Sequence, residues 1–216
     1  MGWYGPCERA VYYSQRNNLL AAAKQCLPTS VITMLAASGV ALPPTPREQP
    51  EDALSRFAES DERVRRYMAE KQGWAVRLGW PPYTEHHTLT YATNLWLGRD
   101  VLAYTMRRPL EAVVADLAWG RCSVVTGRFT PGGHVVCVIG VETEQWLEGG
   151  PRPDQIDMQA VKRVMVHDPW GDWHTGYTDH NGARCLYTVS ELMGLLLTEG
   201  KPDKWVIYLD GGGRNA

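Results

Sequence analysis

Three residues that lie far apart in the sequence have side chains suited to a nucleophile, a general base and an orienting acid: Cys26, His134 and Asp168. Cys26 precedes a run typical of a helix, and the unpaired N–H groups and macrodipole at a helix start favour an anion such as a thiolate. His134 opens a strand-like run after Pro-Gly-Gly, and Asp168 ends a later strand-like run just before Pro169. If these strands are neighbours, imidazole and carboxylate lie close enough for general-base catalysis.

Cys26 taken alone favours a simpler interpretation, because free cysteine is among the most buried residue types. The chain has five widely spaced cysteines and no C-x-x-C pair, which argues against a disulfide framework and a structural zinc site of the usual spacing. We expect the three cysteines within or near strands to be structural: Cys122, Cys137 and Cys185. The order of helix nucleophile, strand base and next-strand acid is the layout of papain-like cysteine peptidases, and it makes catalysis the favoured role of Cys26.

The elements that must position these residues are helices first and strands later. Apolar residues at helical spacing predict a helix over 28–38, with Gly39 as its stop. Further helices are predicted over 51–72, over 85–97, in "RPLEAVVADLAWG" and in "YTVSELMGLLL", the last capped by Ser190. The runs "RCSVVTGRF", "HVVCVIGVE", "VKRVMVHD" and "KWVIYLD" predict strands, the first two as a hairpin. The predicted class is α+β, with N-terminal helices packed on a mainly antiparallel sheet in a single domain over 1–216.

The composition excludes several other classes of protein. With 44% hydrophobic and 21% charged residues, the 216-residue chain is that of a globular protein rather than a disordered one. A net charge of −2 and no sustained Lys/Arg stripe argue against a nucleic-acid partner. The N-terminus has no signal-peptide pattern and no apolar stretch is long enough for a membrane span, so we expect a cytoplasmic protein without stable membrane association. An odd number of cysteines suits a reducing compartment.

Three motifs in order resemble a known family: "SQRNN…C…TSVITML", "GRFTPGGHVVCVIGVE" and "VHDPWGDWHTGY". They are similar to the bacteriocin-leader-processing-like cysteine peptidases, and more closely to the branch found in bacteriophage endolysins and phage peptidases. The resemblance covers roughly residues 12–190. It implies a papain-like fold with Cys26 as nucleophile, His134 as base and Asp168 as orienting acid, and Gln15 would match a glutamine that helps bind the oxyanion.

The resemblance also implies a substrate. A phage endolysin hydrolyses a peptide bond in the stem peptide or cross-bridge of bacterial peptidoglycan, and it accumulates in the host cytoplasm before release to the cell wall. We therefore expect a monomeric thiol hydrolase that needs no cofactor, either an endopeptidase or an amidase. Two alternatives remain: a peptidase that processes a leader or virion protein, and a catalytically inactive binding module. Two positions depart from the family pattern: Leu27 follows the nucleophile where many relatives have Gly or a small polar residue, and Asn17 stands where the phage branch often has Asp.

Aromatic and histidine residues near Asp168 allow other roles. Trp170 and Trp173 flank the predicted site, where they could line a substrate groove or cover the sheet edge. His167 should point to the opposite face of its strand from Asp168, as a surface or supporting residue. A zinc site built from His167, Asp168, His174 and His180 is conceivable, although their spacing matches no zinc signature. The favoured interpretation has no metal.

Overall fold

The computed structural model describes residues 1–196 and 206–210. Within these residues the strands form one sheet in the order β2-β7-β3-β4-β5-β6, and β1 pairs with β4 outside this path. All six of these pairings are antiparallel. The strands are β1 (Gly2–Tyr4), β2 (Leu102–Thr105), β3 (Ser123–Gly127), β4 (His134–Thr143), β5 (Val161–His167), β6 (Cys185–Thr188) and β7 (Val206–Leu209).

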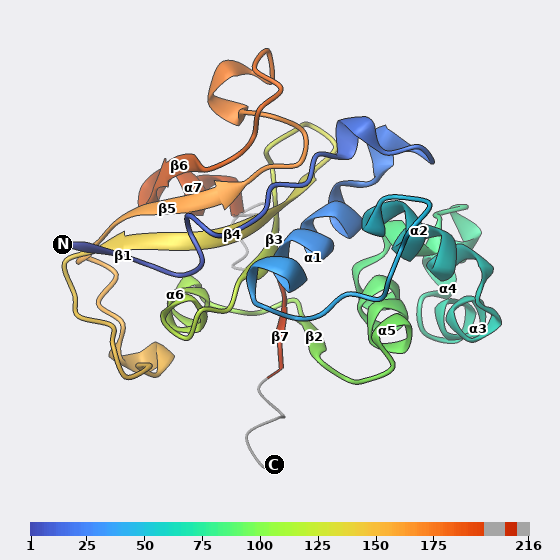
Figure 1. Ribbon diagram of the computed structural model, residues 1–216, viewed down its shortest axis with the longest axis horizontal. Coiled ribbons are helices and arrows are strands. Elements are labelled where there is room, and N and C mark those ends of the chain that lie inside the picture. The colour runs from blue at the N-terminus through green and yellow to red at the C-terminus, as the bar shows by residue number, and fades with distance from the viewer. Residues whose placement is uncertain (197–205, 211–216) are drawn as a thin grey trace.

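The helices cover both faces of this sheet, and α2 to α5 gather to one side of α1 (Figure 1). The α-helices are α1 (Cys26–Ala37), α2 (Pro50–Ser60), α3 (Glu62–Lys71), α4 (Gly73–Arg77), α5 (His86–Leu97), α6 (Leu110–Ala118) and α7 (Val189–Leu196). The short 3-10 helices are η1 (Gln15–Asn17), η2 (Ala22–Lys24), η3 (Pro82–Thr84), η4 (Pro153–Gln155) and η5 (Trp173–Thr175). The predicted α+β class with a mainly antiparallel sheet is confirmed.

The central strand β4 joins the two halves of the core. All ten of its residues are buried. Val135, Cys137 and Ile139 pack with α1, α2 and α5, while Val136 and Val138 pack with α6 and α7. This alternation follows from the two-residue period of a strand, and it makes β4 a rigid support for the residue at its start, His134.

Helix α1 is buried around most of its circumference. Val31, Ile32, Met34 and Leu35 are each fully buried, as expected for a helix in the centre of a core. The Ser30 hydroxyl donates to the Val135 carbonyl at 3.0 Å, which ties the first turns of α1 to the start of β4. The predicted helix is confirmed, with its start two residues earlier, at Cys26.

The prediction of one helix over 51–72 is wrong, because the chain bends at Asp61. Asp61 has extended backbone angles and its side chain accepts a hydrogen bond from the Arg63 N–H, so it begins a second helix, α3. An aspartate is a strong N-cap, and its competition with the helical backbone explains the break. The charged residues at the start of α2 are unusual in being fully buried: Glu51 and Asp52 both have no solvent exposure.

The later strands agree with the sequence pattern, but the cap of the last helix does not. β3 and β4 form the predicted hairpin, and β5 pairs with β4. Thr188, not Ser190, caps α7: its hydroxyl accepts from the Glu191 N–H at 3.2 Å and donates to the Glu191 carboxylate. The short strands β1, β2 and β6 were not predicted, and the first two residues of "KWVIYLD" lie outside the described residues. None of the helices in 1–196 and 206–210 is long and apolar enough to cross a membrane.

A buried acidic pair joins α2 to the segment before Cys26. Asp52 accepts the backbone N–H groups of Leu19 and Leu20. The acceptors around Asn18 assign the orientation of its amide group, and in that orientation the amide nitrogen donates to Glu51 Oε1 at 3.1 Å. The other carboxyl oxygen of Glu51 has no hydrogen-bond partner. Burial therefore raises the pKa of Glu51 from 4.5 to about 7.

The raised pKa of Glu51 predicts a loss of stability with increasing pH. The protonated carboxyl is favoured in the folded state, so its stabilisation is complete below about pH 4.5 and is lost as the pH rises through about 7. Ionisation of Glu51 therefore lowers the free energy of unfolding by about 3 kcal/mol. Denaturant unfolding at about pH 5 and about pH 8 measures it. In Glu51→Gln the difference between the two pH values should shrink by about that amount, and an unchanged difference would contradict the assignment.

Candidate active site

Cys26, His134 and Asp168 come together at the termini of three elements. Cys26 is the first residue of α1, His134 the first of β4, and Asp168 follows the last residue of β5. His134 Nε2 lies 2.7 Å from Asp168 Oδ1. Cys26 and His134 line the same surface hollow of about 390 Å³. Because Nε2 faces the carboxylate, Nδ1 is the imidazole nitrogen left for the thiol.

The surroundings of His134 favour its charged form. The side chain is 5% exposed, and this burial alone would lower its pKa. The hydrogen bonds to Asp168 and Cys26, with the charges of these two groups, outweigh burial and raise the pKa of His134 to about 9. An imidazolium beside a half-buried cysteine stabilises a thiolate, which is the reactive form of the side chain.

Asp168 is fully buried, and both of its carboxylate oxygens accept hydrogen bonds. Oδ1 accepts from His134 Nε2 and from the Trp170 N–H at 2.9 Å, and Oδ2 accepts from the Tyr177 hydroxyl at 3.2 Å. The Asp168 backbone N–H donates to the Gly182 carbonyl at 2.9 Å. A side chain at Gly182 would meet the Asp168 carbonyl oxygen at 1.9 Å, so only glycine fits there. Asp168 is thus fixed in position before any substrate arrives.

The Tyr177 contribution was not predicted from the sequence. Tyr177 has a positive φ of 65°, which is unusual for a residue other than glycine, and its ring lies 6.1 Å from the His134 ring. Its hydroxyl also lies 3.4 Å from the Phe129 carbonyl. Burial, followed by the nearby Asp168 charge, raises its pKa above the ordinary value, so the hydroxyl keeps the proton that it donates to Asp168. Tyr177 is a positioning residue for Asp168.

Two glycines precede His134 in the loop that borders the hollow. Gly133 has a φ of +82°, and a side chain there would have only the Gly127 carbonyl oxygen, at 3.9 Å, within van der Waals range. Backbone conformation, rather than a close approach of neighbouring atoms, is therefore the reason for glycine. Gly132 and Gly133 both line the hollow, which leaves it open beside Cys26 and His134.

Gln15 belongs to the first sequence motif, at the point where that motif is hydrogen-bonded to the third. Its backbone N–H donates to the Pro169 carbonyl at 3.0 Å, and the Ser14 hydroxyl donates to the same oxygen. The Gln15 side chain is buried; its Nε2 donates to the Ala22 carbonyl at 2.6 Å, while its Oε1 has no partner. Gln15 is not among the residues that line the hollow, and its oxyanion role stays a prediction.

Trp170 and Trp173 are not brought to the hollow that Cys26 lines. The Arg16 guanidinium lies over the Trp170 ring at 3.9 Å, and its Nε donates to the Trp170 carbonyl at 2.5 Å. Trp173 packs against the core cluster that contains Tyr187, with the two rings 6.0 Å apart. Both tryptophans support the turn after Asp168, and a substrate contact from either stays a prediction.

The remaining positions from the sequence analysis have structural partners. Leu27 is 2% exposed and belongs to the core cluster beneath α1. His167 is buried rather than on the surface: its Nδ1 accepts from the Arg184 N–H at 3.0 Å and its Nε2 donates to the Ala10 carbonyl at 3.2 Å. Within 1–196 and 206–210, no group of three or more His, Cys, Asp or Glu side chains is placed to hold a metal ion.

The rest of the hollow comes mainly from residues outside the three sequence motifs, with Arg128 as a member of the second motif. Trp80 and Thr84 approach from the chain before α5, His86 from the first turn of α5, and Thr126 and Arg128 from the end of β3. His86 Nε2 lies 2.7 Å from Thr126 Oγ1. No spacing rule connects these residues, because their proximity depends on the contact between the first residue of α5 and the end of β3.

The chain was compared with models of protein families, with curated proteins and with solved structures. No family model matches it, and no curated protein or solved structure matches it. The functional assignment therefore depends on the site geometry and on the three sequence motifs.

The site geometry predicts that Cys26 is the reactive cysteine. Iodoacetamide at about pH 6 should alkylate Cys26 about 10²-fold faster than Cys122 or Cys137, since an ordinary thiol is only ~0.3% thiolate there. The other four cysteines are buried, and burial raises the pKa of Cys7 to about 11 and that of Cys185 to about 12. Mass spectrometry of peptides after short exposure identifies the labelled residue.

His134→Gln is the matched control for this experiment. It removes the imidazolium but keeps a polar side chain, so Cys26 should react at the rate of an ordinary half-buried thiol. If Cys26 in the unmodified chain reacts no faster than Cys122, the interaction between Cys26 and His134 is not the one described.

Proposed function

We propose that this protein is a cysteine peptidase of papain-like fold that hydrolyses a peptide bond of bacterial peptidoglycan, as a phage endolysin does. The observation that carries the proposal is the position of His134, between Cys26 in the shared hollow and the fully buried Asp168 at 2.7 Å. A buried His–Asp pair beside a half-buried cysteine at a helix start is the arrangement that activates a thiol.

The reaction has two halves. The Cys26 thiolate attacks the substrate carbonyl carbon, and the resulting tetrahedral oxyanion collapses to a thioester as the C–N bond breaks. His134, protonated at neutral pH, gives its proton from Nδ1 to the leaving amine. A water molecule then loses a proton to the same nitrogen and attacks the thioester, which releases the carboxylic acid and restores the thiolate. Asp168 holds the imidazole ring in one orientation through both halves.

The start of α1 offers hydrogen-bond donors for the oxyanion. The first N–H groups of a helix have no partner within the helix, and those of Cys26 and Leu27 are of this kind. The next residue, Pro28, has no N–H, so only Cys26 and Leu27 offer backbone donors among the first three residues of α1. Gln15 holds the Ala22 carbonyl with one amide hydrogen, and its second amide hydrogen is the one proposed to reach the oxyanion.

The peptidoglycan substrate is inferred from the resemblance of three ordered motifs to phage peptidases. The position of Cys26 at a surface hollow bordered by two glycines supports the proposal, since an extended or branched peptide would bind there. The segment of the first motif, residues 14–18, is hydrogen-bonded to the turn of the third, so these motifs build one site.

Incubation with purified sacculi tests this function. The protein should lower the turbidity of the suspension and release new amino groups, and mass spectrometry of the released muropeptides identifies the bond. Cys26→Ala should abolish both signals with an unchanged far-UV circular dichroism spectrum, because it removes only the nucleophile. Cys7→Ala, which removes a buried thiol outside the hollow, is the matched control and should retain activity.

Three outcomes would overturn parts of the proposal. Full activity of Cys26→Ala would exclude the proposed nucleophile. Intact sacculi together with Cys26-dependent cleavage of a protein substrate such as casein would indicate a protein-processing peptidase. No hydrolysis of either substrate by the unmodified protein would indicate a binding module instead.

A further inference from the structure

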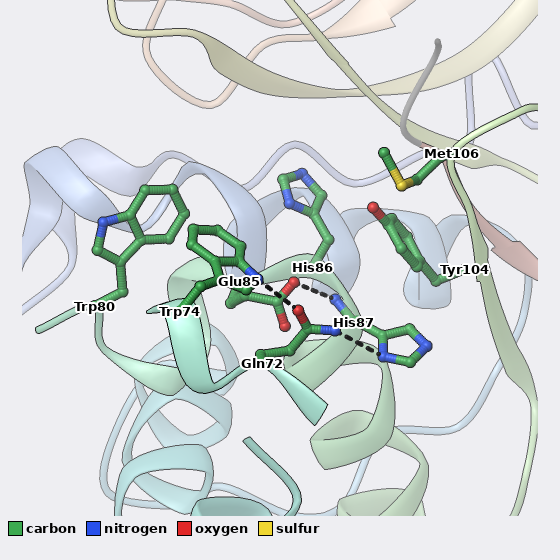
Figure 2. A pocket seen from close by; sticks show the side chains of 8 residues that line it. All are labelled: Gln72, Trp74, Trp80, Glu85, His86, His87, Tyr104 and Met106. Carbon is green, nitrogen blue, oxygen red and sulfur yellow. Dashed lines mark hydrogen bonds between the residues drawn. The ribbon is translucent and has the colours of Figure 1, made fainter. Parts of the chain in front are cut away.

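A second pocket, lined largely by aromatic residues, adjoins the Cys26 hollow. It has a volume of about 350 Å³ and shares Trp80 and His86 with that hollow. Figure 2 shows its lining side chains, which come from the chain around α4, the start of α5 and the end of β2. The residues are Gln72, Trp74, Trp80, Glu85, His86, His87, Tyr104 and Met106. The sequence analysis gave none of them a role.

The two tryptophans form an exposed aromatic wall. Trp74 and Trp80 meet edge to face, with ring centroids 5.0 Å apart, and each is about two-fifths exposed, at 42% and 41%. The indole N–H of Trp74 donates to Gln72 Oε1 at 2.8 Å. Its polar edge is therefore occupied, and the part that it offers to a ligand is the ring face. Large aromatic side chains left exposed around a hollow indicate a binding site.

The pocket carries negative charge. Glu85 is the N-cap of α5, and its carboxylate accepts hydrogen bonds from the His87 and Thr88 N–H groups. Among the described residues the lining contains no lysine or arginine. His86 is neutral near neutral pH, because burial lowers its pKa to about 4. Burial and then the Glu85 charge raise the pKa of Tyr104, whose ring lies 5.5 Å from His87, to about 12.

Burial disfavours any charged group here, as the lowered pKa of His86 shows, but the Glu85 charge attracts a cation at the exposed faces of Trp74 and Trp80. An ammonium group over a tryptophan face gains from the ring quadrupole, and a nearby carboxylate adds to this attraction. Arg128, by contrast, lines the Cys26 hollow and not the aromatic pocket. A substrate that extends from the Cys26 hollow past the shared Trp80 would thus enter a pocket that is also lined by Trp74 and Glu85, neither of which lines that hollow.

We propose that the pocket of Trp74, Trp80 and Glu85 binds an alkyl side chain of the peptide substrate that ends in a primary ammonium group. The methylene groups pack on the indole rings and the ammonium lies near the Glu85 carboxylate. This inference builds on the proposed function, since it specifies the residue that the peptidase recognises next to the bond it cleaves.

Binding of a small probe to the inactive Cys26→Ala protein tests the site without any need for catalysis. The probes are Nα-acetyl-lysine amide and its neutral isostere, in which a methyl group replaces the ammonium. NMR of the tryptophan indole N–H signals should show the lysine probe shifting Trp74 and Trp80, with an affinity about tenfold above that of the isostere. Adding Trp74→Ala should abolish these shifts at Trp80.

Control variants separate charge from apolar contact. Glu85→Gln should reduce the affinity for the lysine probe to about that for the isostere, since it removes the charge but keeps a hydrogen-bonding side chain. Trp146→Ala removes an exposed tryptophan outside the pocket and should change neither affinity. Circular dichroism of each variant checks the fold.

Equal affinities for the two probes would overturn the inference, because the pocket would then recognise only apolar area. Stronger shifts of Trp74 and Trp80 by N-acetylglucosamine than by the lysine probe would also overturn it, in favour of a sugar site. Binding of the lysine probe by a protein that cleaves neither sacculi nor casein would support the site and refute the peptidase. Cleavage of sacculi by a protein that binds both probes equally would support the peptidase function and refute the ammonium-binding site.

Discussion

The hydrogen bond between His134 and Asp168 is the constraint on which the rest of the site depends. A carboxylate with no solvent exposure costs several kcal/mol unless its oxygens are satisfied and its charge is balanced. His134 supplies the compensating charge, and Trp170 and Tyr177 supply further hydrogen bonds. The same interaction raises the pKa of His134, because the Asp168 carboxylate stabilises the imidazolium just as the imidazolium stabilises the carboxylate.

This constraint extends to elements that take no part in the His134–Asp168 hydrogen bond itself. The turn after Asp168 must hold Tyr177 at a positive φ, and Gly182 must approach the Asp168 carbonyl more closely than a side chain allows. The first motif is bound to the same turn through Ser14, Gln15 and Arg16, so the segment leading to Cys26 is fixed by contacts with the two residues that follow Asp168. The buried Asp52 holds the other side of that segment, through Leu19 and Leu20.

The sequence was informative where local patterns are strong. The helix after Cys26, the hairpin before and after the glycines and the strand ending at Asp168 follow from periodicity and turn residues, and their ends are where the site forms. The break at Asp61 was missed because the amphipathic pattern continues through it, and the short strands β1, β2 and β6 have too few residues for a clear period. Tyr177 and the aromatic pocket could not be predicted, since each depends on packing between distant segments. Trp170 illustrates the opposite error: it is close to the proposed triad in sequence, but Arg16 covers its ring.

Asp168 and Cys26 together keep His134 protonated at neutral pH. Titration of the imidazole nitrogens by NMR, with the His134 signals assigned by comparison with His134→Gln, measures this charge state directly. We expect a pKa of about 9 for His134 in the unmodified protein. We also expect a lower value in Cys26→Ala, because that variant lacks the interactions of Cys26 with the imidazole. A His134 that titrates at or below its ordinary value of 6.5 in the unmodified protein would contradict the account.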